Sequence, residues 1–227
     1  MPKRKKRIMA ATLTILIILI GCLGFGIYGK ISGFPWQKSK AEEEIKMYLK
    51  ENFSSDMQIN KMQYNLMTNN YFARVSPTSA DFEFLVSIEK DGSISNDYFA
   101  HFWASEIKND ISSKLKNMPA NSIRVNIFAT PILTKKYANL MDKLPEYTDV
   151  LDDLATIDIY CDFPYEFTDG ELANLYQVYN VIRTDIPFQS LSFSYSNKVF
   201  QFDNADNSHI DNASDLQKYL KDITPKK

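Results

Sequence analysis

The sequence predicts an α+β protein in which an N-terminal transmembrane helix precedes two small two-layer α/β domains. Three observations lead to this prediction. A charge-free apolar run follows five cations at the N-terminus. Alternating apolar residues then indicate an antiparallel meander packed on a helix, and a later β-α-β-α-β-β-α order indicates a mixed-sheet sandwich. We place a basic tip and anchor at residues 1–30, a linker at 31–38, the first domain at 39–118 and the second at 119–227.

The N-terminal segment has the properties of a membrane anchor. Five cations between Lys3 and Arg7 precede the run from Ile8 to Tyr28, which contains no Asp, Glu, Lys or Arg. A helix of that length spans roughly 30 Å, the thickness of a hydrocarbon core. Because positive charge gathers on the N-terminal side, we expect a cytoplasmic N-terminus and an extracellular chain after Lys30. The expected partner of residues 8–28 is the lipid bilayer.

Two other interpretations of this segment remain open. Residues 19–22, Leu-Ile-Gly-Cys, resemble a bacterial lipobox, in which the cysteine is lipidated and becomes the new N-terminus. Cys22 is therefore a candidate lipidation site. A cleavable secretory signal is the other interpretation, since Gly24 and Gly26 imitate a small-residue cleavage site. The apolar run continues past these positions to Tyr28, which favours the uncleaved helix. All three interpretations place the remaining chain outside the membrane.

Charge is distributed unevenly along the chain. The whole sequence has 26 Lys+Arg and 28 Asp+Glu, but residues 1–30 hold six of the cations and none of the anions. Residues 31–227 therefore carry 20 cations and 28 anions, a net charge of −8. Nucleic-acid binding needs clustered cations, so this acidic part argues against a nucleic-acid partner. It argues equally against peripheral binding to anionic lipid.

Cysteine is scarce. Cys161 is the only cysteine outside the anchor, so neither an intradomain disulfide nor a cysteine metal cluster can form. Its neighbours have the pattern of a strand, and we expect Cys161 to be a small buried residue. An exported domain without disulfides is commoner in Gram-positive bacteria than among secreted animal proteins.

The first domain is expected to begin with a helix. Ser39 and Glu42 have the spacing of a capping box, which places the helix start at Ser39. Strands with alternating apolar residues follow, and a change of phase near Lys61 indicates a β-bulge. The helix and the strands should therefore pack as two layers.

Turn signals divide the strands of this domain. Asn69–Asn70 and Asp91–Gly92 are typical of hairpin turns, so we expect about four antiparallel strands. A second helix is predicted over residues 98–117, with an apolar stripe along one side. Pro119 ends it, and we place the domain boundary near residues 117–121.

The second domain mixes strands and helices in a different order. Capping residues, apolar periodicity and a Ser196–Asn197 turn define its elements. In chain order these are a strand over 122–129, a helix capped by Thr134 with Tyr137, Leu140 and Met141, a strand over 155–161, a helix capped by Thr168 with Glu171, a hairpin over 188–202 and a last helix over 213–223.

Short motifs in the first half resemble one family. They are Gly33-Phe34-Pro35-Trp36, Tyr48-Leu49-Lys50, Tyr64-Asn65, Asp91-Gly92 and Asp97-Tyr98, together with the basic start and the apolar helix. Through them the chain resembles the YfjL-like membrane proteins of Gram-positive bacteria over most of residues 1–115. The resemblance implies a membrane-tethered, two-domain protein. It implies no activity and no catalytic residue.

Residues that carry chemistry are few. His101 and His209 are the only histidines, whereas a zinc site needs several His or Cys at short spacing. No Gly-x-Ser-x-Gly elbow and no phosphate-binding glycine loop is present. We therefore assign no catalytic, cofactor-binding or metal-binding residue, and we expect no cofactor.

Clustered carboxylates leave one enzymatic alternative. A hydrolase can use two carboxylates about 5–10 Å apart, and oxygen ligands can also hold Ca²⁺. The candidate oxygen donors are Asp149, Asp152, Asp153, Asp158 and Asp162, and a polar loop over residues 203–207. We expect most of these side chains to be solvated, which leaves a cell-envelope hydrolase using Asp158 and Asp162 as the alternative.

The favoured function is a non-enzymatic, extracytoplasmic binding or regulatory domain with an envelope protein as its partner. Its interface is expected to be aromatic, and the candidates around Pro164 are Tyr160, Phe163, Tyr165 and Phe167. The other interpretation of these four side chains is that they close the core of the second domain.

Overall fold

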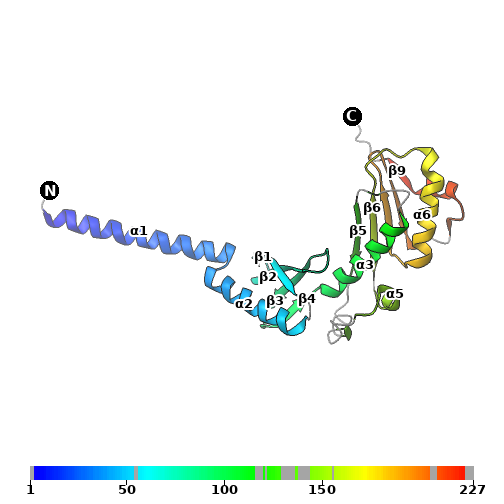
Figure 1. Ribbon diagram of the computed structural model, residues 1–227. Helices are drawn as coiled ribbons and strands as arrows, with labels where there is room; N and C mark the ends of the chain where they lie inside the picture. Colours follow the sequence, from blue (N-terminus) through cyan, green and yellow to red (C-terminus); the bar gives the residue numbers. More distant parts are fainter. Residues whose placement is uncertain are drawn as a thin grey trace. The chain divides into compact units, whose positions relative to one another are not determined.

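The computed structural model of the protein describes residues 3–53, 56–115, 120, 122–128, 136–137, 144–154, 156–204 and 209–222, without the side chains of 3–12, 30, 153 and 222 (Figure 1). The main elements are α1 (Lys3–Ser32), α2 (Pro35–Asn52), β1 (Met57–Asn65), β2 (Asn70–Pro77), β3 (Phe84–Ile88), β4 (Ile94–Asn96), α3 (Tyr98–Lys114), β5 (Ser122–Ile127), α5 (Tyr147–Val150), β6 (Ile157–Asp162), α6 (Leu172–Asp185), β7 (Ser190–Ser194), β8 (Lys198–Asp203) and β9 (Leu220–Asp222). The short 3₁₀ helices are η2 (Leu151–Asp153), η3 (Asp169–Glu171) and η5 (Ala213–Tyr219).

The chain divides into two compact units. The first unit comprises Met1–Ser79 and Phe84–Asn96, and the second comprises Ala80–Glu83 and Asp97–Lys227. The first contains an antiparallel sheet and the second a mixed sheet. The predicted α+β class, with one sheet of each kind, is therefore confirmed.

In the first unit, a sharp bend separates α1 from α2. Gly33 has a φ of 72°, and Pro35 is the first residue of α2. Proline suits that position because the missing N–H would have no helical partner there. The predicted capping box at Ser39 and Glu42 is therefore wrong. Ser39 lies inside α2, where its hydroxyl donates to the carbonyl oxygen of Pro35 at 3.2 Å.

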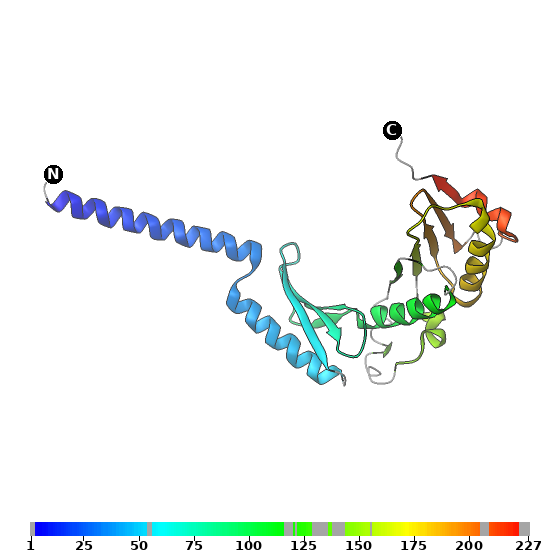
Figure 2. The same cartoon turned by 45° about the horizontal axis from the view of Figure 1, so that its top comes forward.

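Strands β1 to β4 form the predicted antiparallel meander, and α2 packs against one of its faces (Figure 2). The register shifts between Ile59 and Lys61, which confirms the predicted bulge. Both hairpin turns are also present, with φ values of 56° at Asn69 and 82° at Gly92. The core is made by apolar side chains of both layers, such as Ile45 on α2 and Val75 on β2.

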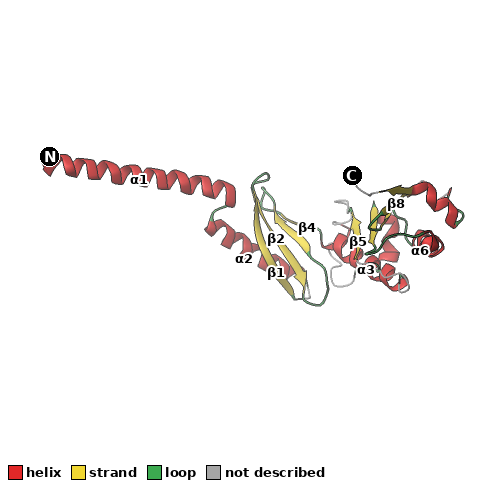
Figure 3. Ribbon diagram, turned by 90° about the horizontal axis from the view of Figure 1, so that it is seen from above, coloured by secondary structure: helices red, strands yellow, loops and turns green. Residues whose placement is uncertain are grey.

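In the second unit the strand order is β5-β6-β7-β8-β9. Only β6 and β7 are parallel, and α6 provides the connection between them. The helices α3 and α6 lie on the same side of this sheet (Figure 3). The side chains that face them are buried and apolar, including Ile159 and Cys161 on β6 and Phe193 on β7. The hairpin predicted over residues 188–202 is confirmed as β7 and β8.

Helix α3 lies in the second unit, whereas the sequence placed it in the first domain, before a boundary near residues 117–121. The structure divides the chain between Asn96 and Asp97. The cause is the direction of its apolar stripe, because Trp103, Ile107 and Ile111 are fully buried and α3 packs on β5. Periodicity identifies such a stripe but does not say which sheet covers it.

The last predicted helix, over residues 213–223, is wrong. This segment forms the 3₁₀ helix η5 and then β9. The side chain of Asn212 accepts from the N–H of Ser214, and the Asp215 carboxylate accepts from the N–H of Asn212, a capping box that holds a tight first turn. The following residues extend the sheet instead, since Leu220 pairs with Phe200 on β8.

The start of α6 also differs from the prediction. Thr168 precedes η3 without a side-chain cap hydrogen bond, and α6 itself begins at Leu172. Several predicted features lie outside the described residues: Pro119 as a helix stop, Thr134, Leu140 and Met141 of the predicted helix, and residues 205–207 of the polar loop.

Helix α1 runs without interruption over thirty residues. Its large apolar side chains described between Leu13 and Ile31 are all 48–67% exposed. They include six consecutive residues, Ile15–Ile20, which surround the helix on every side because each residue advances by about 100°. Within the described part of the chain, no helix meets the length and hydropathy required of a membrane span.

Candidate functional site

The described cysteines and histidines lie on different elements of the chain. Cys22 is exposed on α1, whereas Cys161 is buried in β6, where burial and then the charge of Asp162 raise the pKa of its thiol to about 12. His101 lies on α3 with Nε2 3.2 Å from Asp97 Oδ2, and His209 is exposed. Among the described side chains, no group of three His, Cys, Asp or Glu residues could hold a metal ion.

The two carboxylates proposed for a hydrolase share one strand face but do not converge. Asp158 and Asp162 lie on β6 with Tyr160 between them, on the side of the sheet opposite Cys161. Four residues of a strand separate them by about 13 Å, beyond the range for a catalytic pair. Asp158 accepts from Ser190 Oγ at 2.9 Å, and Asp162 accepts from Ser122 Oγ at 2.7 Å.

The remaining carboxylates of that cluster are elsewhere in the second unit. Asp149 belongs to α5 and Asp152 to η2, and both are exposed. The side chain of Asp153 lies outside the described residues. The sequence therefore groups five carboxylates that the fold distributes over a strand and a helical turn.

Two of the four candidate interface aromatics belong to the core instead. Phe163 is 4% exposed and stacks on Tyr195 at 4.7 Å, and Phe167 meets the Phe200 ring edge-on at 4.8 Å. Tyr165 is half-buried against Phe163 and Tyr195. Phe163 and Phe167 thus close the core of the second unit, which is the alternative interpretation given in the sequence analysis.

Tyr160 is different because it lies on the open face of the sheet. The Arg124 guanidinium lies over its ring, 5.3 Å from the ring centre, and contacts Asp162 at 3.4 Å. Neighbouring positions of this face carry Ser192 and Gln201, which pair with each other across β7 and β8. Tyr160 is thus the one aromatic side chain in the described row of Arg124, Tyr160, Ser192 and Gln201.

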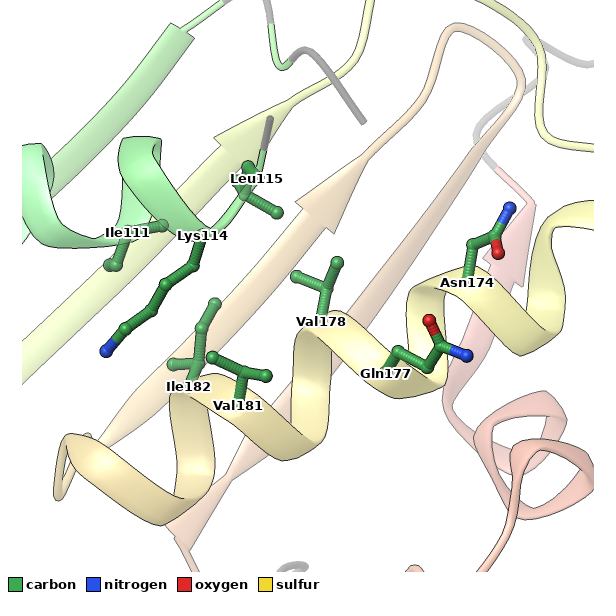
Figure 4. A pocket seen from close by; sticks show the side chains of 8 residues that line it. All are labelled: Ile111, Lys114, Leu115, Asn174, Gln177, Val178, Val181 and Ile182. Carbon is green, nitrogen blue, oxygen red and sulfur yellow. The ribbon is translucent and has the colours of Figure 1, made fainter. Parts of the chain in front are cut away.

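A groove lies between α3 and α6 in the second unit (Figure 4). Its volume is about 210 Å³. The groove is lined by apolar side chains from both helices, with polar side chains at its rim: Ile111, Leu115, Val178, Val181 and Ile182, then Lys114, Asn174 and Gln177. Ordinary small-molecule pockets are larger, at roughly 300–1,000 Å³. The groove therefore suits one or two apolar side chains of a protein partner.

A charged cluster fixes the rim of this groove. Lys114 on α3 donates to Asp110 and to Asp185 at the end of α6, each at 2.7 Å, and so joins the two helices. The hydroxyl of Tyr147 donates to Asp110 Oδ2 at 2.5 Å. The backbone N–H of Tyr147 donates to Glu106 Oε2 at 3.0 Å. The cluster therefore holds the Lys114 ammonium between carboxylates of both helices.

The electrostatics of the cluster keep it charged at neutral pH. Burial acts to raise the pKa of Asp110, but hydrogen bonds from Lys114 and Tyr147 outweigh it and hold that pKa below its usual value. Burial likewise acts to lower the pKa of Lys114, and its bonds to Asp110 and Asp185 outweigh this and raise it. Burial and the Asp110 hydrogen bond raise the pKa of Tyr147, which therefore stays neutral.

In the first unit, aromatic side chains gather where α1 meets α2. Phe34 stacks on Trp36 with 4.7 Å between ring centres, and Phe25 of α1 lies 5.6 Å from Phe34. The Tyr71 hydroxyl donates to the carbonyl oxygen of Phe34 at 3.1 Å. Gly33 is required here, since a Cβ at its positive φ would collide with the Tyr71 hydroxyl. We call Phe25, Gly33, Phe34, Trp36 and Tyr71 the aromatic junction.

Comparison with family models decides the relationship of this first unit. Residues 5–98 match the model of the YfjL-like, N-terminal domain. Over this segment, which is less than half of the 227 residues, the chain is similar to the YfjL-like N-terminal domain. Comparisons with curated proteins and with solved structures give no match.

The segment that matches the YfjL-like domain contains most of α1, then α2 and all four strands of the first sheet. The motif residues that suggested the family have structural roles in it, because Gly33 forms the bend and Gly92 a hairpin turn with positive φ. Tyr48 accepts a hydrogen bond from Asn96 at 2.7 Å, which joins α2 to the last strand. The α3–α6 groove lies beyond the YfjL-like domain.

Proposed function

We propose that this protein is a single-pass membrane protein, with a cytoplasmic N-terminus and both units outside the cell, that acts by binding and not by catalysis. The observation that carries the proposal is the exposure of α1, whose apolar side chains point in every direction into the surroundings. Soluble monomers rarely expose contiguous apolar patches above a few hundred Å². A hydrocarbon environment removes this cost.

The length of the charge-free run supports the same assignment. From Ile8 to Tyr28 the chain has 21 residues without a charge, of which residues 8–12 precede the side chains that the structure describes. About 20 such residues are needed to span a bilayer. The aromatic junction follows directly, and aromatic side chains prefer the membrane–water interface.

A lipoprotein anchored through Cys22 is the alternative form of attachment. Cys22 is exposed on α1, and the helix continues past it for ten more residues to Ser32. That largely apolar continuation supports the uncleaved form. In the lipoprotein form, the mature chain would begin at Cys22 and residues 1–21 would be lost.

Intact-mass analysis of the full-length chain, extracted from native membranes, separates the two forms. We expect the mass of the uncleaved chain, and we expect protease added to intact cells to digest residues 31–227 while a membrane-protected N-terminal fragment survives. A mass that begins at a lipidated Cys22 would replace the helix by a lipid anchor. Complete protection from external protease would contradict the extracellular location.

Within the second unit, we assign the binding role to the α3–α6 groove, with an apolar side chain of an envelope protein as its occupant. The groove volume supports this size of occupant. Val181, which is 39% exposed, lies at its edge, and Lys114 is held in place by two carboxylates. A preformed pocket with a fixed rim is what an anchoring side chain requires.

A photocrosslinking residue at position 181 tests this assignment in native cells. We expect one adduct with a distinct envelope protein, and we expect Val178→Asp to reduce it by at least about tenfold because a buried unpaired charge opposes apolar docking. The matched control carries the same crosslinker at Gln201, on the open face of the sheet. Equal adducts at positions 181 and 201, or an adduct of the chain with itself alone, would overturn the assignment.

A further inference from the structure

The turn between β1 and β2 presents apolar side chains on a well-ordered support. Met67 is 93% exposed and Leu66 is 57% exposed. The side chain of Asn65 accepts from the N–H groups of Met67, at 3.0 Å, and Thr68. Asn69 adopts a positive φ of 56°. Hydrogen bonds of the turn itself therefore hold two large apolar side chains in water, which costs free energy without a partner.

This turn lies at the end of the sheet that meets the aromatic junction. Tyr64 and Tyr71 lie on either side of the turn and pair across β1 and β2. Their ring centres are 5.1 Å apart. Tyr71 is the residue whose hydroxyl bonds to Phe34. In Figures 2 and 3 the β1–β2 turn is the end of the first sheet nearest to the C-terminal end of α1.

The turn is also free of charge. No Asp, Glu, Lys or Arg occurs between Lys61 and Arg74. The neighbouring hairpin turn is different, since Glu89, Lys90 and Asp91 follow one another there. An uncharged tip with two apolar side chains is suited to the boundary between lipid headgroups and acyl chains, where no ion pair is needed.

We propose that the β1–β2 turn is a second membrane contact, in which Leu66 and Met67 enter the outer interface of the same bilayer that α1 crosses. This inference rests on the proposed membrane anchor. The aromatic junction connects the two contacts, so the turn and the end of α1 reach the interface together. Two points of attachment restrict the tilt of the first unit on the membrane, whereas a helix alone leaves it free to rotate.

Lipid contact at the turn can be measured with the full-length chain in phosphatidylcholine vesicles. The fluorophore NBD is attached to Met67→Cys in a Cys22→Ser background, where Cys161 does not react because it is fully buried. The matched control is Thr78→Cys, an exposed position at the other end of β2, about 25 Å along the strand. Neither labelled side chain contributes to the core.

We expect a blue-shifted emission at position 67 and quenching by headgroup-labelled nitroxide lipid that exceeds quenching at position 78 by about threefold or more. The shift should persist at high salt, since the contact is apolar. Equal quenching by aqueous iodide at both positions would overturn the inference. A blue shift without lipid quenching would also overturn it, because a protein would then cover the turn.

Flotation of the same vesicles separates this inference from the proposed anchor. A chain that does not float with the vesicles contradicts the membrane anchor itself. A chain that floats but keeps position 67 in water contradicts only the second contact. The double variant Leu66→Ser with Met67→Ser is expected to float as the wild-type chain does, while emission of a label at Asn69→Cys moves toward that of a water-exposed fluorophore.

Discussion

Two lysines in the middle of α1, introduced as Leu16→Lys with Ile20→Lys, are expected to remove the protein from the membrane fraction. Both side chains are more than half exposed on the helix surface, so neither change disturbs a packed core. Each lysine at the centre of a spanning helix costs about 3 kcal/mol, and the pair shifts the insertion equilibrium by roughly 10⁴-fold. The measurement is flotation after alkaline extraction of membranes.

The control for this prediction replaces the same residues by valine, Leu16→Val with Ile20→Val, which keeps the segment apolar. We expect the valine variant to float like the wild-type chain. A lysine variant that remains fully in the floating fraction would contradict a spanning α1. Adding Cys22→Ser to that variant shows whether a lipid on the cysteine holds it there.

Local sequence signals predicted the parts of the fold that depend on neighbouring residues. The change of phase at Lys61 predicted the bulge because side chains of a strand alternate between its two faces. Asp91-Gly92 predicted its turn because Gly92 adopts a positive φ that other residues disfavour. The helix start at Ser39 was wrong because Pro35, four residues earlier, already supplies a favourable first position.

Features that depend on residues far apart in the chain were not predicted from the sequence. Lys114 and Asp110 have a visible helical spacing, but Asp185 joins them from 71 residues away. The α3–α6 groove likewise needs two helices that the sequence placed in different domains. Asp158 and Asp162 were proposed as a pair because they are close in sequence, although four residues of a strand, which the sequence also predicted here, separate them by about 13 Å.

Strand alternation accounts for the different places of two aromatic residues in one segment. Tyr160 and Phe163 are three positions apart, yet one lies on the open face of the sheet and the other in the core. The alternation of β6 explains Tyr160, because its neighbours Ile159 and Cys161 point inward. Phe163 continues the same alternation one residue past the strand, and its N–H donates to the carbonyl oxygen of Ser194.

Replacement of Trp103 by alanine is expected to have the largest effect on the stability of the second unit. Trp103 has no exposed surface and packs against Phe99 at 5.9 Å and Tyr137 at 5.1 Å. Its indole N–H donates to the carbonyl oxygen of Pro145 at 3.1 Å. Loss of the ring leaves a cavity and an unpaired acceptor, which together cost about 4 kcal/mol.

That loss is a large part of the 5–15 kcal/mol by which a typical domain is stable. The chain offers a matched control, because its other tryptophan, Trp36, is 58% exposed in the first unit. Urea unfolding followed by far-ultraviolet circular dichroism should show an earlier transition for Trp103→Ala and an unchanged curve for Trp36→Ala. Trp103→Phe should fall between them, since it keeps an aromatic ring but loses the donor to Pro145. If Trp103→Ala and Trp36→Ala unfold at the same urea concentration, the contact between Trp103 and Pro145 does not stabilise the second unit as the structure indicates.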